Sequence, residues 1–232
     1  MSSNPYRPPS HAERASAGAF RELGPLSLAI SVVFFMEAVA LLSMSALMTR
    51  FTKRTGSAGF QPSPEDTESM MLALGGGLSA ILFLLLYFCG LILLCLWVYR
   101  ANANLEVLVP SGSEFTPGWA VGWFFVPIAN LFKPYQVVSE IYRASDPAAD
   151  PDYWNLAPLP FYLPLWWGSY LVFNVLTNFA PFGMLQAGCG VVSMATLVTI
   201  VRSVRRMQEE KVRGLSSAQF AEARPAPNPL LP

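Results

Sequence analysis

The 232-residue sequence is poor in charge, in cysteine and in histidine. Only 13% of its residues are charged, whereas an ordinary soluble domain has about 25%. The 15 basic residues balance the 15 acidic ones, which argues against a nucleic-acid partner because such proteins present a net basic surface. Three cysteines without a CxxC motif and one histidine, His11, argue against zinc and haem sites. We therefore expect no metal and no cofactor, and we interpret the cysteines as small buried apolar residues.

The charges that are present avoid four long windows of the chain. These windows total 87 residues and contain one charge, Glu37, whereas the other 145 residues contain 29. A membrane-spanning helix needs about 20 apolar residues to cross a hydrocarbon core of about 30 Å. The sequence therefore predicts an all-α polytopic integral membrane protein with four transmembrane helices. The predicted spans are residues 26–48, 72–98, 161–179 and 184–201.

The distribution of lysine and arginine predicts the orientation of these spans. With four spans, 12 of the 15 basic residues fall on one side, and only Arg50, Lys53 and Arg54 fall on the other. The positive-inside rule then places both termini in the cytoplasm. Residues 1–24 and 214–232, rich in proline and alanine, are predicted as disordered cytoplasmic tails around a membrane domain of residues 25–213.

The segment 115–145 carries the most specific pattern in the chain. Thr116 and Pro117 predict a helix start, because proline is favoured at the first helical position. The uncharged run 118–132 would reach only about 22 Å as a helix, and Pro127 interrupts it. A re-entrant or interfacial helix therefore explains this run better than a fifth span, which would also reverse the charge bias.

A second helix is predicted after this run, over residues 134–144. Tyr135, Val138 and Ile141 share one face at helical spacing, whereas the polar residues Gln136, Glu140 and Arg143 lie elsewhere. This pattern is typical of an amphipathic helix at the membrane interface. The segment 115–145 is therefore predicted as a re-entrant or interfacial helix pair.

The run PGWAVGWFFVPIANLFKPYQVV, preceded by WVYRANANLEVL, resembles a family of bacterial multi-pass membrane proteins known as a domain of unknown function. The resemblance covers roughly residues 72–206. It implies a bacterial cytoplasmic (inner) membrane protein and brings no reaction, ligand or cofactor with it. Motif residues with an expected structural role are Pro117, Gly118, Trp119, Trp123, Pro127 and Pro134. The other matching residues are Phe124, Ile128, Asn130, Leu131, Lys133 and Tyr135.

Two candidate sites stand out from this pattern. Glu37 lies at the middle of the first span, where a charge costs several kcal/mol and often serves proton or cation movement. A structural carboxyl group paired with Asn174, Asn178 or a serine is the alternative. The second site is polar and is formed by Asn130, Lys133, Tyr135 and Gln136.

The second site also has two interpretations. It binds an anionic headgroup or a small anion, or Lys133 snorkels to the interface while Asn130 and Gln136 bond backbone groups freed at the helix break.

The sequence predicts a non-enzymatic function. No pair of catalytic groups is placed where two such groups would meet. The favoured hypothesis is a membrane scaffold or a protein that binds lipids or membrane partners, including a second copy of itself. The alternative is a small transporter or channel that uses Glu37 and the broken segment around Asn130–Lys133.

Overall fold

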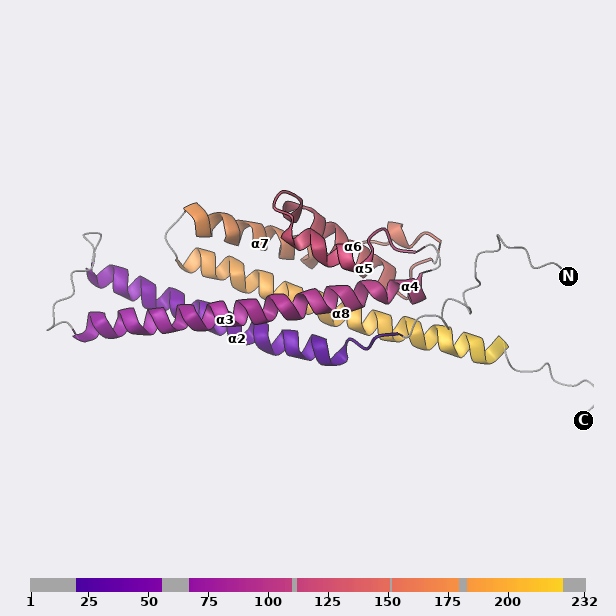
Figure 1. Ribbon diagram of the computed structural model, residues 1–232, viewed down its shortest axis with the longest axis horizontal. Helices are drawn as coiled ribbons and strands as arrows, with labels where there is room; N and C mark the ends of the chain where they lie inside the picture. The colour runs from indigo at the N-terminus through magenta and orange to yellow at the C-terminus, as the bar shows by residue number, and fades with distance from the viewer. Residues whose placement is uncertain (1–19, 56–66, 110–111, 151, 180–182, 223–232) are drawn as a thin grey trace, which may run out of the picture. The chain divides into compact units, whose positions relative to one another are not determined.

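A computed structural model describes residues 20–55, 67–109, 112–150, 152–179 and 183–222 (Figure 1). All regular structure in these residues is helical, which confirms the all-α part of the predicted fold class. The chain divides into two compact units, and two of the four boundaries between them fall inside long helices, at residues 97–98 and 202–203. Among the described residues, unit 1 comprises residues 20–23, 98–109, 112–150, 152–159 and 203–222, and unit 2 comprises residues 24–55, 67–97, 160–179 and 183–202.

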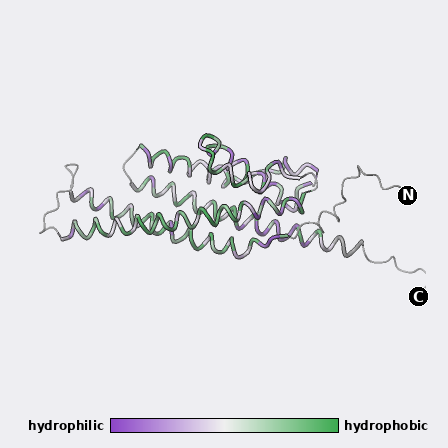
Figure 2. Tube along the Cα trace, in the orientation of Figure 1, coloured by the Kyte–Doolittle hydropathy of each residue, from purple (hydrophilic) through white to green (hydrophobic). Residues whose placement is uncertain are grey.

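The long helices follow the apolar windows of the sequence. They are α2 (Gly24–Thr55), α3 (Thr67–Ala103), α7 (Tyr162–Phe179) and α8 (Met184–Glu222). Among the described helices, three are long and apolar enough to cross a membrane, within Gly24–Lys53, Met70–Leu108 and Met184–Ser217. Figure 2 shows the long hydrophobic stretches along α2 and α3. The third predicted window forms α7, which is not among these three helices.

The helices are longer than the predicted spans. The predicted tail 214–232 is wrong in its first part, because α8 continues to Glu222. A single glycine, Gly214, costs a helix about 1 kcal/mol relative to alanine and does not end it. At the other end, residues 20–23 are ordered within unit 1 and Leu23 is buried. Residues 1–19 and 223–232 of the predicted tails lie outside the described residues.

In unit 2, α2 and α3 run antiparallel in close contact. A Cβ atom at Gly90 would lie 2.6 Å from the Phe34 ring, and one at Gly75 would lie 3.5 Å from Leu47. The lack of a side chain at Gly90 therefore permits this close approach. Cys89 is exposed, so its expected burial is wrong. A membrane helix has no need to bury a small apolar side chain, because lipid solvates it as well as protein does.

Helix α8 also lies antiparallel to its neighbours in unit 2. Gly190 approaches both Leu41 of α2 and Phe173 of α7. Near the start of α8, Gln186 Nε2 donates to Thr177 Oγ1 at 2.6 Å, close to the end of α7. These contacts confirm the predicted antiparallel pairing of the last two helices, whose connection at residues 180–182 lies outside the described residues.

Unit 1 is built from short helices. They are α4 (Leu105–Leu108), α5 (Pro117–Gly122), η1 (Trp123–Phe125), η2 (Ala129–Leu131), α6 (Lys133–Ser145) and η3 (Trp154–Leu156). Helix α6 contacts α4, η1, η2 and η3, and it buries Val138 and Ile141 as its amphipathic pattern predicts. The assignment of Glu140 to an outer polar face is wrong, because its side chain is buried.

Candidate functional site

The central segment starts as the sequence predicts and then bends repeatedly. Helix α5 begins at Pro117 after the N-cap Thr116, although the Thr116 hydroxyl makes no capping hydrogen bond. The helix tightens into η1, and Pro127 separates η1 from η2. The predicted break in this segment is therefore present.

Backbone groups satisfy one another across this break. The Asn130 N–H donates to the Val126 carbonyl at 2.8 Å, and the Phe132 N–H donates to the Ala129 carbonyl at 3.1 Å. Among the described residues, no side-chain hydrogen bond is formed by Asn130, Lys133 or Gln136. The hypothesis that these side chains bond freed backbone groups is therefore wrong. Tight turns already pair those groups, as buried backbone requires.

Lys133 instead lies against aromatic rings. Its Nζ is 5.1 Å from the centroid of the Phe115 ring and 5.6 Å from that of Trp123. The Trp123 ring lies 5.0 Å from the Trp119 ring. The two distances from Lys133 Nζ are typical of cation–π contacts, which hold an ammonium group in place without neutralising its charge. The structure thus brings Lys133 against one predicted motif tryptophan, Trp123, which in turn lies against a second, Trp119.

Large apolar side chains of the same segment are exposed. The five most exposed have between 47% and 76% of their surface exposed. They are Trp119, Phe125, Ile128, Leu131 and Phe132. Monomeric soluble proteins rarely expose contiguous apolar patches, and such a patch marks a protein or membrane contact. We refer to these five residues as the apolar rim.

Glu140 supports the loop that carries one of the rings on Lys133. Its Oε1 accepts a hydrogen bond from the Glu114 backbone N–H at 2.5 Å. Burial of the carboxyl group, together with the nearby charge of Glu114, raises the pKa of Glu140 to about 7, although hydrogen bonds from the backbone of Glu114 and Phe115 oppose the shift. Helical periodicity suggested a surface position, so sequence reasoning missed this residue.

A second polar cluster in unit 1 centres on Gln208 of α8, which is fully buried. Its Nε2 donates to the Ala101 carbonyl and to Ser145 Oγ, both at 3.0 Å. Its Oε1 accepts from Asn104 Nδ2 at 2.8 Å. One side chain therefore connects α8 to α6, to the end of α3 and to Asn104.

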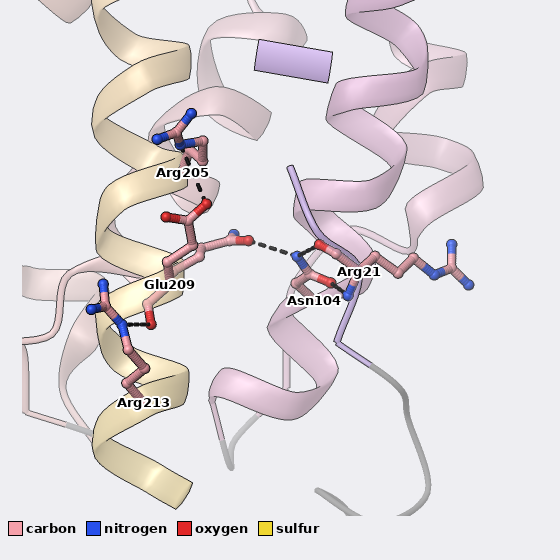
Figure 3. A network of polar contacts seen from close by, with 6 residues as sticks. Arg21, Asn104, Arg205, Glu209 and Arg213 are labelled. Atoms are coloured by element: carbon pink, nitrogen blue, oxygen red, sulfur yellow. Dashed lines mark hydrogen bonds and ion pairs between the residues drawn. The ribbon is translucent and has the colours of Figure 1, made fainter. Parts of the chain in front are cut away.

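Asn104 extends this cluster to the N-terminal segment. Its Oδ1 accepts from the Arg21 N–H at 2.8 Å, and its Nδ2 donates to the Arg21 carbonyl at 2.9 Å (Figure 3). Lys211, one turn after Gln208, donates to the Ala144 carbonyl at 2.9 Å. A cation at this position stabilises the C-terminus of α6. The WVYRANANLEVL run, which contains Asn104, was the available signal for this cluster.

Glu37 belongs to unit 2, whereas the residues described above belong to unit 1. Its side chain is only 3% exposed and lies close to Gly90 of α3. The predicted partners bond their own helix instead: Asn174 donates to the Tyr170 carbonyl and Asn178 to the Asn174 carbonyl. The predicted pairing of Glu37 with these amides is therefore wrong.

Three apolar helices, together with a unit of short helices around a buried polar cluster, define an α-helical membrane protein. Residues 69–209 match the family model described as Domain of unknown function (DUF4328). The match covers more than half of the chain, so the chain belongs to this family. It includes the central segment and Gln208 but not Glu37. No curated protein and no solved structure shows significant similarity to the chain.

Proposed function

We propose that this chain is a non-enzymatic, multi-pass membrane protein that binds lipid through the central segment of unit 1. The apolar rim is the observation that carries this proposal. Burial of apolar surface contributes about 25 cal/mol per Å², so five large exposed side chains favour an apolar environment. The chain also has helices that suit a bilayer. Lipid is therefore the apolar environment that we expect to contact the apolar rim.

The chemistry of the segment suits the boundary between headgroups and acyl chains. Tryptophan is enriched at this depth of a bilayer, and Trp119 is part of the apolar rim. Lysine keeps its ammonium group at the polar level while its stem follows apolar surface. In this proposal the rings of Phe115 and Trp123 hold Lys133 at the level of anionic headgroups.

The proposal includes the predicted topology in a bacterial cytoplasmic membrane. Helix α7 has 18 residues and would reach about 27 Å, close to the thickness of the hydrocarbon core. Its antiparallel pairing with α8 supports its role as a fourth span. Four spans, together with the bias of basic residues, support a cytoplasmic location for both termini and for the central segment.

A fluorescent label at Ile128 tests the lipid contact. The native cysteines, Cys89, Cys95 and Cys189, are first replaced by alanine, and Ile128→Cys is then labelled with an environment-sensitive fluorophore in proteoliposomes. Because Ile128 is 76% exposed, we expect blue-shifted emission and quenching by spin-labelled lipids. Gln136→Cys, exposed on α6, is the matched control with water-like emission.

Two outcomes would contradict the proposal. Equal quenching of both labels by aqueous iodide would show that the apolar rim faces water. Labelling of Ile128→Cys by a membrane-impermeant maleimide in sealed right-side-out vesicles would place the segment outside the cell. Protection in these vesicles together with lipid quenching would support both the contact and the topology.

The transport alternative depends on Glu37 and is weaker. Glu37 is buried and lies outside the residues that match the family, whereas the central segment lies inside them. We therefore expect Glu37→Gln to keep the fold and to leave proton permeability of proteoliposomes unchanged, as measured with a pH-sensitive dye inside the vesicles. A proton flux in the wild-type protein that this variant abolishes would overturn the proposed function.

A further inference from the structure

A groove of about 680 Å³ lies between α2 and α8 in unit 2. Its walls are mainly aliphatic and aromatic side chains. Leu28 and Arg202 lie at one end, and Leu42 and Val191 lie at the other. The groove therefore combines a long apolar channel with one permanent positive charge at its end.

The charge at this end is positioned by the protein. Arg202 Nε donates to Ser31 Oγ at 3.1 Å, and Ser31 Oγ in turn donates to the Ser27 carbonyl at 2.7 Å. Within the described part of the chain, Arg202 forms no ion pair with a carboxylate. Its guanidinium group is thus oriented through Nε, and its two terminal nitrogens keep the donors that suit a phosphate group.

The groove is long enough to hold the acyl chain of a lipid in one leaflet of a bilayer. Leu28 and Leu42 are separated by 14 helical steps, which is about 21 Å. One leaflet contributes half of the hydrocarbon core, about 15 Å. Arg202 follows the last apolar window of α8 directly, so it lies at the depth where lipid phosphates begin.

We propose that this groove binds one anionic phospholipid. An acyl chain occupies the channel between α2 and α8, and the lipid phosphate accepts hydrogen bonds from Arg202. This site uses residues other than those of the central segment, so it stands or falls independently of the proposed function. The apolar channel and the unneutralised arginine at its end select a lipid rather than a soluble anion.

Native mass spectrometry tests this site. The full-length protein is exchanged into micelles that contain equal amounts of phosphatidylglycerol and phosphatidylcholine, and the retained lipids are counted. We expect Arg202→Gln to lower the preference for phosphatidylglycerol about tenfold, the loss expected for a charge-assisted hydrogen bond. Arg206→Gln is the matched control, since Arg206 is exposed on the same helix but does not line the groove.

A second variant tests the acyl channel. Ala195 lines the groove and is exposed, so Ala195→Trp fills the channel without disturbing the buried core. We expect this variant to retain neither lipid. Equal effects of Arg202→Gln and Arg206→Gln would show general charge attraction and overturn the site. Full lipid retention by Ala195→Trp, or a second copy of the chain retained in place of lipid, would also overturn it.

Discussion

Replacement of Gln208 by methionine is expected to lower the free energy of unfolding by about 3 kcal/mol, at about 1 kcal/mol for each of its hydrogen bonds. Methionine has a similar length, so the change removes the contacts to Ala101, Ser145 and Asn104 without a large cavity. Asn104 and Ser145 are themselves buried, so no water replaces the lost partner. Denaturant unfolding in mixed micelles measures the change.

Gln136→Met is the matched control for this experiment. Gln136 is exposed on α6, so its replacement should change stability by no more than about 0.5 kcal/mol. The double variant Gln208→Met with Asn104→Ala should be less destabilised than the sum of the two single variants, because both changes remove one shared hydrogen bond. Equal stability of the Gln208 and Gln136 variants would contradict a central role for Gln208.

The stability of unit 1 should fall as the pH rises from about 4.5 to about 7. In the folded protein, burial raises the pKa of Glu140 from 4.5 to about 7, so the folded state holds this proton more tightly than the unfolded chain does. Below pH 4.5 both states are protonated. Above pH 7 both are ionised, and the full penalty, at most about 3 kcal/mol, remains.

Glu140→Gln should remove this pH dependence. The amide oxygen can still accept the hydrogen bond from the Glu114 N–H, but it carries no charge to bury. We therefore expect the variant to be more stable than the wild-type protein at pH 8 and equally stable near pH 4. Glu106→Gln, at an exposed glutamate of the same unit, serves as the control. Identical pH profiles for wild-type and Glu140→Gln protein would show that Glu140 is not the group responsible.

Hydropathy and the positions of the prolines predicted much of the fold correctly. The four apolar windows became α2, α3, α7 and α8 because long uncharged runs form helices whether protein or lipid surrounds them. Pro117 and Pro127 marked the start and the break of the central segment, because proline acts on the backbone of its own immediate neighbours. The family resemblance rested on the same local run and is confirmed by the match over residues 69–209.

Sequence reasoning was less successful for side chains whose partners are distant in the chain. No local pattern singles out Gln208, yet it is fully buried and bonds residues about 100 positions away. Glu140 was assigned to an outer face because helical periodicity shows which residues share a side of α6 but not what covers that side. One of the two interpretations of Glu37 paired it with Asn174, Asn178 or a serine, but both amides bond their own helix.

The low charge of this chain thus has two different consequences. Where charge is absent over a whole window, the sequence determines a membrane-type helix, because the free energy of that choice is summed over many neighbouring residues. Where single polar residues remain, only the tertiary structure decides their role. The orientation of Lys133 by Phe115 and Trp123, and of Arg202 by Ser31, depends on which segments pack together, and no local pattern contains that information.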